Sequence, residues 1–303
     1  MARALLLPGQ NPTLKTHNKL SFKSGKFSYL IETKGDASTY SVSDGAHTIS
    51  LPIQWTFGAG AQTFVLKRDG EFLESLVSYY PEIEGLDITI GDNALTPQTI
   101  EEAAGRKLSK NEVMSCFRCH STNSVTDNKL TLESLSAGVR CEHCHTEAPT
   151  HLRAITHPDT GPGFKNTIPE KLGQRSAESI SNFCGQCHRS WETVVRNNWR
   201  GAINVRFQPY RLANSKCFDG ADARIRCVAC HNPHEDLVRT DSAYDDKCRA
   251  CHASGGNHAA KSCPVAQTNC VSCHMPKVRL PGGHETFTDH DIRAVNSEEP
   301  YPN

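Results

Sequence analysis

Six copies of one short pattern, C-x-x-C followed at once by histidine, constrain this chain more than any other feature. Twelve of the 14 cysteines belong to these pairs, and only 15 of the 303 residues are histidine, so chance does not explain the repetition. The pairs are Cys116/Cys119, Cys141/Cys144, Cys184/Cys187, Cys227/Cys230, Cys248/Cys251 and Cys270/Cys273. The adjoining histidines are His120, His145, His188, His231, His252 and His274. Any fold must therefore present six thiol pairs, each with an imidazole beside it.

The pattern C-x-x-C-H is the attachment site of c-type haem. Its two thiols form thioether bonds with the haem vinyl groups, and the adjacent histidine becomes the proximal ligand of the iron. Zinc sites and redox-active dithiols also use paired cysteines, but neither needs histidine at the same offset every time. The sequence therefore predicts six covalently attached haem c groups, with the paired cysteines as cofactor-binding residues and the adjoining histidines as iron ligands.

All six motifs lie in the last 188 residues of the chain. This leaves about 31 residues for each haem, too few to build a separate hydrophobic core around each one. We expect the haems themselves to supply most of the apolar interior, with short helices and loops wrapped over them. Haems that share so small a volume lie within electron-tunnelling reach of one another.

The part of the chain before the first motif has a different character. Short segments rich in β-branched and aromatic residues alternate with turn sequences such as KGD, SDG and RDG. The expected strands are residues 26–33, 39–43, 47–57, 62–68, 71–80 and 86–90. A helix capped by Thr96 should follow, and the capping-box spacing of Ser109 and Glu112 predicts a second helix that runs into the first motif.

We therefore expect an α+β fold with two domains. A β-rich, haem-free module occupies residues 1–108, and a mainly α-helical, loop-rich hexahaem domain with little regular sheet occupies residues 109–303. The helical assignment of the second domain rests on the cysteine motifs, each of which needs a turn of backbone to present both sulfurs to one edge of the macrocycle.

Charge and hydropathy limit the partners and the location of the chain. The 33 basic and 33 acidic residues cancel, so the composition does not suggest nucleic acid or an acidic membrane as a partner. No apolar run approaches the roughly 18 residues that suggest a transmembrane helix. Because c-type haem is attached outside the cytoplasm, we expect a periplasmic or extracellular protein. The start MARALLLPGQ lacks a signal-peptide core, which conflicts with this location, so we expect either that a signal was removed or that Met1 is not the natural start.

The second axial ligand of each iron is expected to be histidine. Only three methionines occur, and Met114 and Met275 lie too close to haem motifs to reach an iron well. Nine histidines remain beyond the proximal six: His17, His47, His143, His151, His157, His234, His258, His284 and His290. In CVACHNPHEDL, Pro233 stiffens the turn after the fourth motif, so that His234 points away and can bind a neighbouring iron.

Several stretches resemble one superfamily of multihaem c-type cytochromes. They are CVACHNPH, GVRCEHCHTEAPTHL (138–152), VRFQPYRLANSKCF (205–218) and CVSCHMPKVRLPGGHETFTDHDIR (270–293). The superfamily includes the nitrifier tetrahaem cytochromes, pentahaem nitrite reductase and hydroxylamine oxidoreductase. The resemblance implies that His151, His290 and His17 are distal ligands. His284 and His234 are the next candidates, His258 and His157 compete for the sixth place, and His143 and His47 rank lower.

The resemblance supports the haem scaffold more than either enzyme's chemistry. The chain has no C-x-x-C-K, the motif of the open haem in that nitrite reductase. No motif marks the tyrosine-crosslinked haem of hydroxylamine oxidoreductase, although Tyr210, Tyr244 and Tyr301 stay open as candidates. We therefore favour an electron carrier that serves redox donor and acceptor proteins or an extracellular acceptor. The alternatives are a subunit of an extracellular cytochrome filament, and an oxidoreductase whose single open haem acts on a small nitrogen or sulfur species.

Two cysteines, Cys217 and Cys263, stand outside the motifs. In an oxidising compartment an even pair of this kind favours a disulfide, here between the segment after the third motif and the loop before the sixth. Two free thiols are the alternative.

Overall fold

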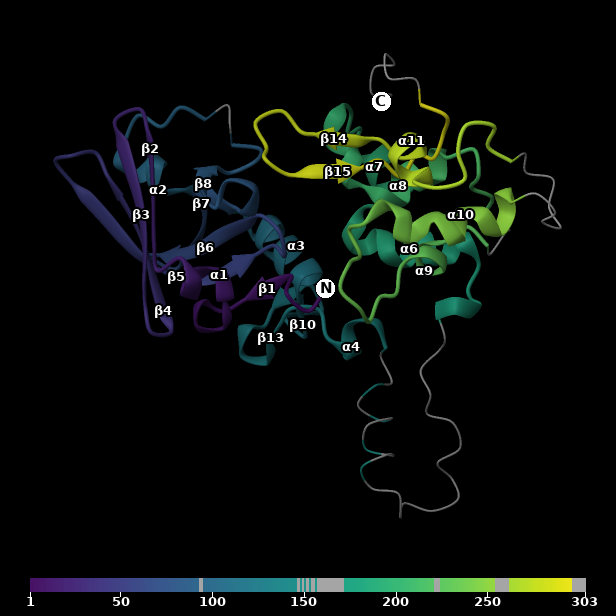
Figure 1. Ribbon diagram of the computed structural model, residues 1–303. Helices are drawn as coiled ribbons and strands as arrows, with labels where there is room; N and C mark the ends of the chain where they lie inside the picture. Colours follow the sequence, from purple (N-terminus) through teal and green to yellow (C-terminus); the bar gives the residue numbers. More distant parts are fainter. Residues whose placement is uncertain are drawn as a thin grey trace. The chain divides into compact units, whose positions relative to one another are not determined.

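The computed structural model describes residues 1–92, 95–145, 148, 150, 153, 156, 172–220, 224–253 and 262–295. The chain divides into two compact units. The first unit comprises Met1–Pro169 with Pro281–Glu285, and the second comprises Glu170–Leu280 with Thr286–Asn303. Figure 1 labels their helices and strands, and each unit is described by itself.

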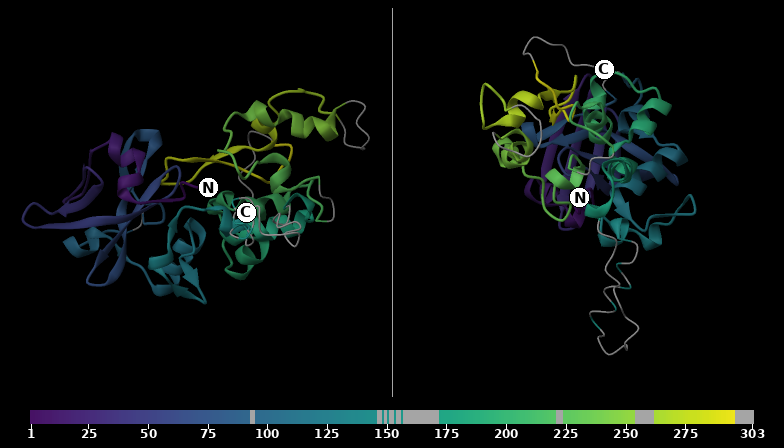
Figure 2. Two further views of the ribbon diagram at one scale, coloured as in Figure 1. Left: turned by 90° about the horizontal axis from the view of Figure 1, so that it is seen from below. Right: turned by 90° about the vertical axis from the view of Figure 1, so that its right-hand side faces the viewer.

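The first unit is built around an antiparallel sheet of nine strands in which most sequence neighbours pair directly (Figures 1 and 2). The strand order is β2-β3-β4-β5-β6-β7-β8, while β1 pairs with β5 and β9 pairs with β7. The strands are β1 (Leu5–Leu6), β2 (Lys19–Ser24), β3 (Phe27–Lys34), β4 (Ala37–Ser43), β5 (Thr48–Phe57), β6 (Gln62–Arg68), β7 (Glu71–Tyr80), β8 (Gly85–Ile88) and β9 (Arg106–Lys107). Tight turns connect them; Asp69 and Gly70, both at positive φ, turn β6 into β7.

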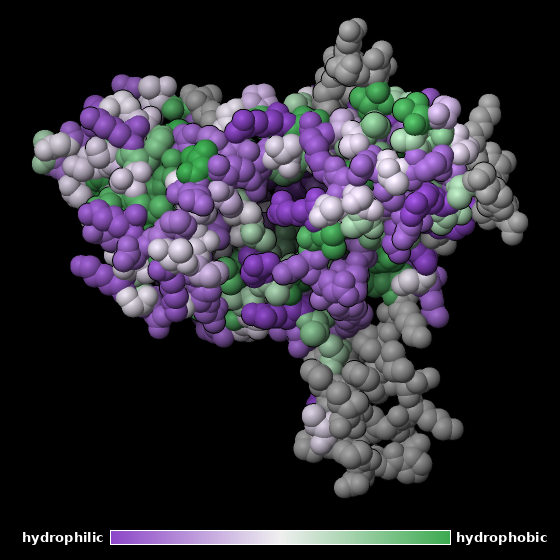
Figure 3. Space-filling model, viewed as in Figure 1, coloured by the Kyte–Doolittle hydropathy of each residue, from purple (hydrophilic) through white to green (hydrophobic). Residues whose placement is uncertain are grey.

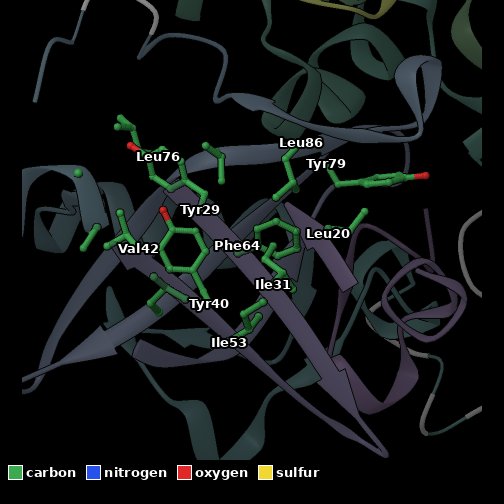
Figure 4. Close-up of a cluster of buried hydrophobic side chains, with 14 of the residues drawn as sticks. Leu20, Tyr29, Ile31, Tyr40, Val42, Ile53, Phe64, Leu76, Tyr79 and Leu86 are labelled. Atoms are coloured by element: carbon green, nitrogen blue, oxygen red, sulfur yellow. The ribbon is translucent and has the colours of Figure 1, made fainter. Parts of the chain in front are cut away.

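One face of the strands encloses the larger apolar core of the first unit. Figure 4 shows Tyr29, Ile31, Tyr40 and Phe64 converging there from β3, β4 and β6, and each is at most 1% exposed. Every second residue of β3 between Phe27 and Ile31 is buried, as expected for a strand with one covered face. The short helices α1 (Pro12–Thr16) and α2 (Ile100–Ala104) add Leu14, Ala103 and Ala104 to this cluster.

A second core joins the sheet to the helix of the first cysteine motif. This helix, α3 (Lys110–His120), begins with the predicted capping box of Ser109 and Glu112, which is confirmed. Its Phe117 is 1% exposed and packs edge-on against Trp55 at 5.1 Å and Phe57 at 5.2 Å between ring centroids. The sheet therefore forms a wall beside the first motif.

Two small strand pairs and a one-turn helix follow α3. Strand β10 (Ser121–Thr122) pairs with β13 (Ser136–Ala137), and β11 (Val125–Thr126) pairs with β12 (Lys129–Leu130). Helix α4 (Cys141–Cys144) then carries the second cysteine motif.

The second unit consists of short helices linked by turns and extended segments. Its elements are α6 (Ala177–His188), α7 (Trp191–Arg196), α8 (Gln208–Asn214), α9 (Cys227–Cys230), α10 (Asp245–His252), α11 (Cys270–His274), the 3-10 turns η4 (Leu172–Gln174), η5 (Ala202–Arg206) and η6 (Asp241–Tyr244), and the strands β14 (Lys277–Arg279) and β15 (Thr286–Thr288). The two strands form an antiparallel pair. Among the described residues, no helix is both long and apolar enough to cross a membrane.

The predicted fold class is wrong in its account of the region after residue 108. That region was expected to be mainly helical with little sheet, yet it contains three antiparallel strand pairs: β10 with β13, β11 with β12, and β14 with β15. Its helices α4 and α9 have only four residues each. The physical reason is that each cysteine motif needs a single helical turn, and little else in these stretches favours a longer helix. The expected domain boundary at residue 108 concerns haem content and stays a prediction.

Candidate haem sites

All six cysteine pairs lie on a helical turn. Helices α3, α6 and α10 end in a motif, whereas α4, α9 and α11 consist of little more than the motif itself. In the second motif the backbone N–H of His145 donates to the carbonyl of Cys141 at 2.8 Å, and in the fourth His231 donates to Cys227 at 2.9 Å. Residues three apart share one face of a helix, so both thiols of each pair point the same way. This arrangement suits attachment to one edge of a haem.

The second cysteines of the first, third and fifth motifs lie in longer helices and not on isolated turns. Cys119, Cys187 and Cys251 are each the last residue but one of their helix, in α3, α6 and α10 respectively, and all three are half-buried. The described residues contain no cluster of three or more side chains that could hold a metal ion, at these three cysteines or elsewhere. The structure thus places Cys119, Cys187 and Cys251 beside their histidines, while their bonding to haem stays a prediction.

None of the 14 cysteines is buried. Cysteine is ordinarily among the most buried residue types, because its side chain behaves as a small apolar group. Here Cys141, Cys217, Cys230 and Cys273 are exposed and the other ten are half-buried. Thiols that stay partly open to solvent on helical turns leave room for a covalently attached group. The donor set therefore fits haem c.

Within the second unit, motifs that are distant in sequence lie side by side. The thiols of Cys184 in α6 and Cys227 in α9 form a hydrogen bond, and this bond together with burial raises the pKa of Cys184. Cys248 in α10 and Cys270 in α11 are likewise hydrogen-bonded, while burial raises the pKa of Cys248. The third motif therefore neighbours the fourth, and the fifth neighbours the sixth.

Three of the proximal histidines already hold Nδ1 in a polar contact. His120 Nδ1 lies 2.9 Å from the carbonyl oxygen of Ala4 in the first unit, and His274 Nδ1 lies 3.0 Å from that of Arg293 in the second. His231 Nδ1 faces the Tyr244 hydroxyl at 3.5 Å. A metal-binding histidine usually donates its second N–H to such an acceptor, which fixes the ring and leaves Nε2 for the metal. His120 and His274 have this arrangement.

His290 faces the proximal histidine of the fourth motif. The ring centroids of His231 and His290 are 6.2 Å apart, with an interplanar angle of 41°. His290 Nδ1 lies 3.0 Å from the carbonyl oxygen of Thr288, and burial lowers the pKa of His290 to about 4, so the ring is neutral. Metal–imidazole bonds of about 2 Å on each side of an iron would place two ring centroids roughly 6 Å apart. The spacing of the pair therefore suits one iron between them.

Three other predicted distal ligands, His17, His284 and His234, lie among the described residues. In the first unit, His17 Nε2 lies 3.2 Å from the Tyr79 hydroxyl, and His284 Nε2 lies 2.7 Å from Asp87 Oδ2. The nitrogen that would bind iron is thus engaged in both residues. In the second unit, His234 is exposed on the turn after the fourth motif.

Two further predicted ligands, His151 and His258, lie outside the described residues, as does His157. Of the remaining proximal ligands, His188 ends α6 and influences His290 electrostatically, His252 ends α10, and His145 follows α4. The structure thus gathers His188, His231 and His290 in one place in the second unit.

The predicted disulfide between Cys217 and Cys263 is not formed. Both residues are free thiols. Cys217 instead lies near enough to Cys248 to act on its thiol electrostatically. Its position is set locally, because its backbone N–H donates to the Ser215 hydroxyl at 3.3 Å at the end of α8.

Sequence reasoning missed two groups of residues that support the histidines. Arg211 in α8 forms a buried ion pair with Asp289, directly before His290. Asp245, at the start of α10, accepts hydrogen bonds from the backbone N–H groups of Asn269 and Cys270 at 2.8 and 2.9 Å, so it caps α11. Asp289 and Asp291, which flank His290, were the available signal for the ion pair, but the partner of Asp289 lies 78 residues away.

The comparisons with known proteins agree with the chemistry of these motifs. The family model of cytochrome c554 and c-prime matches residues 93–146. The multiheme cytochrome MtrA of Shewanella baltica is 23% identical over 227 residues, which cover 69% of this chain and 58% of that protein. The chain thus spans somewhat more than half the length of this relative. No solved structure matches. Over these parts the chain is thus similar to a c-type cytochrome family and to a multihaem cytochrome.

Proposed function

We propose that this chain carries electrons through six closely packed haem c groups, one at each C-x-x-C-H motif. The observation that carries the proposal is that every one of the six cysteine pairs lies on a helical turn with histidine directly behind it. The hydrogen-bonded thiols of the third and fourth motifs, and of the fifth and sixth, support short distances between successive haems.

Each haem is proposed to be held by the two thiols of one motif. The pairs that would form the thioether bonds are Cys116 with Cys119, Cys141 with Cys144, Cys184 with Cys187, Cys227 with Cys230, Cys248 with Cys251, and Cys270 with Cys273. The support is that the two thiols of each pair share one face of a helical turn.

The proposed coordination is bis-histidine. We assign His290 as the distal ligand of the fourth haem, opposite His231. Their ring centroids are 6.2 Å apart, and Nδ1 of each ring contacts an oxygen atom, which leaves both Nε2 atoms for iron. His17, His151, His234, His284 and His258 are proposed for the other haems. For His17 and His284 this requires that Nε2 exchange its present hydrogen bond for the iron.

A location outside the cytoplasm follows from the attachment chemistry, so we propose a periplasmic or extracellular protein with redox donors and acceptors as partners. Residues 1–108 are proposed to carry no haem and to form one wall of the first haem site. The support is that Phe57 packs against the His120 ring at 5.3 Å and that the Ala4 carbonyl lies at His120 Nδ1.

Haem content and carbon monoxide binding test this proposal. A haem assay on the purified protein should give six haems per chain. Because bis-histidine iron resists displacement, carbon monoxide should leave the Soret band of the reduced protein unchanged. His290→Ala should then create one carbon monoxide-reactive haem in six. The matched control is His47→Ala, which removes a 78% exposed ring.

Each other outcome has a definite meaning. Fewer than six haems would overturn the haem count. Carbon monoxide binding by the unmodified protein would favour the oxidoreductase with one open haem. A His290→Ala variant that has its full haem content and binds no carbon monoxide would show that His290 is not an iron ligand.

A further inference from the structure

Arg211 and Asp289 form a salt bridge that water does not reach. Their side chains are 2% and 0% exposed. Arg211 Nε donates to Asp289 Oδ1 at 2.8 Å, and Nη2 donates to Oδ2 at 2.8 Å, which gives the two-pronged geometry of the strongest arginine–carboxylate pairs. Arg211 lies in α8, and Asp289 lies on the segment that follows β15. The pair therefore joins α8 to the residue directly before His290.

The same carboxylate also organises the turn that contains His290. Asp289 Oδ1 accepts the backbone N–H of Asp291 at 3.1 Å, and Oδ2 accepts Nη1 of Arg293 at 2.8 Å. Arg293 Nη1 further donates to the carbonyl of Asp291 at 2.7 Å. The residues on both sides of His290 are thus tied to a single buried group, so the His290 backbone has little freedom to move.

This turn reaches the sixth motif as well. The backbone N–H of Asp289 donates to the carbonyl of Pro276 at 2.9 Å, and that of Arg293 donates to the carbonyl of His274 at 3.2 Å. His274 Nδ1 in turn contacts the Arg293 carbonyl at 3.0 Å. One short segment therefore contacts a proximal histidine and carries the histidine that faces another.

Stability alone does not account for such a pair. Removing two charges from water costs several kcal/mol per ion, so a buried ion pair often contributes no more than apolar side chains of the same volume would. Its geometry is specific, because a two-pronged pair fixes both the distance and the plane of the carboxylate. Specificity of position matters here because His290 must stand opposite His231 for both to bind one iron.

We propose that Arg211 and Asp289 form a positioning pair that holds His290 opposite His231 and so keeps the fourth haem closed to external ligands. This inference rests on the proposed ligation by His290. The pair does not touch the iron; it acts through the backbone of residues 289–291. Because Arg293 links the same carboxylate to His274, the pair also couples the ligand geometry of the fourth and sixth haems.

The test uses the full haem-loaded protein and measures how much reduced haem binds carbon monoxide. Arg211→Met should add a reactive fraction approaching one haem in six. Arg211→Lys keeps the charge but cannot form both hydrogen bonds, so a smaller, non-zero fraction is expected. Arg196→Met, which removes an arginine with a 72% exposed side chain from its pair with Glu192, is the control and should add none. If Arg211→Met fails to load all its haems, Arg211→Lys decides the question.

A double variant separates this inference from the proposed function. With His290 already replaced by alanine, Arg211→Met should add no further reactive haem, because both changes open the same iron. If His290→Ala opens one haem and neither Arg211 variant opens any, the positioning role is wrong while the ligation stands. If His290→Ala itself opens none, the ligation fails first. An additive double variant would show that Arg211 acts on a different haem.

Discussion

The first unit buries two clusters of apolar side chains against its sheet, whereas the second unit encloses few apolar side chains and buries an ion pair. Among the described residues 172–295, the buried apolar side chains are Ala177, Ile180, Val194, Val205, Tyr210, Leu212, Val271 and Leu280. These are scattered over several elements, and both of the contiguous core clusters belong to residues 5–137. A compact unit needs an apolar interior. The sheet thus has its own core, whereas the second unit buries few apolar side chains of its own, and we expect bound haem to complete its interior.

The second unit also exposes several large apolar side chains. Trp191, Leu237 and Val265 are 48%, 62% and 88% exposed. Polar residues dominate the face drawn in Figure 3, with apolar residues scattered among them. Large apolar side chains left in water are costly at about 25 cal/mol per Å². We expect bound haem to cover part of this apolar surface.

Loss of one haem should produce the largest difference in protease resistance between the two units. Replacing Cys227 and Cys230 by alanine removes the thioether bonds that we propose for the fourth haem, next to the third motif and His290. We expect protease cleavage in the second unit to rise about tenfold or more, because cleavage follows the population of opened states. The sheet of the first unit should stay resistant.

Mass mapping of the fragments over a digestion time course measures this effect. Cys217→Ala, which removes an exposed thiol outside the motifs, is the control and should leave the pattern unchanged. Equal resistance of both units in the double alanine variant would contradict the idea that haem forms the core of the second unit.

The predicted features that the structure confirms are those with a local cause. The strands of the first unit follow from alternating apolar residues and from turns such as Asp69–Gly70, where only a local backbone preference is at work. The start of α3 follows from Ser109 and Glu112. The start of α2 was misjudged, because Thr99, not Thr96, has a glutamate three residues later and forms the capping box with Glu102.

What could not be predicted depends on long-range contacts. The pairing of Arg211 with Asp289 spans 78 residues and leaves no periodic pattern in the sequence. The facing rings of His231 and His290 belong to segments that meet only in the folded second unit. The region after residue 108 was misjudged because the helices that carry a motif end with it, and because the second unit buries few apolar side chains of its own.

A cavity in the core of the first unit should destabilise that unit and leave the second unit unchanged. Phe64 is fully buried in the core of the sheet, so Phe64→Ala should lower the free energy of unfolding of the first unit by about 3–5 kcal/mol. The reduction potentials of the haems in the second unit should stay unchanged, because that unit does not use this core. Chemical denaturation followed by far-ultraviolet circular dichroism and a redox titration measure the two quantities.

The control is Ile83→Ala, which shortens a side chain that is 44% exposed and should change stability by less than about 0.5 kcal/mol. A Phe64→Ala protein in which the second-unit haems shift as strongly as the sheet loses stability would show that both units share one cooperative core.

The smallest expected effect concerns the cap of the first haem helix. Helix α9 has no side-chain cap and α11 is capped only from α10, by Asp245, whereas α3 has its own box of Ser109 and Glu112, reinforced by Arg106. Hydrogen bonding from Ser109 and the ion pair with Arg106 lower the pKa of Glu112 from 4.5 to about 2. A carboxylate whose pKa is lowered by folding adds stability above its unfolded pKa and loses it as the pH falls toward its folded pKa.

Glu112→Gln should therefore cost about 1 kcal/mol at pH 7, a value that allows for solvent screening of this 43% exposed side chain, and the cost should shrink between pH 5 and pH 2. Denaturant melts of the wild type and the variant at several pH values measure the difference. Glu102→Gln, which alters the equivalent box at α2, shows how much of the effect comes from the capping bonds alone. A cost that is the same at pH 7 and pH 3 would mean that the charge of Glu112 does not stabilise α3.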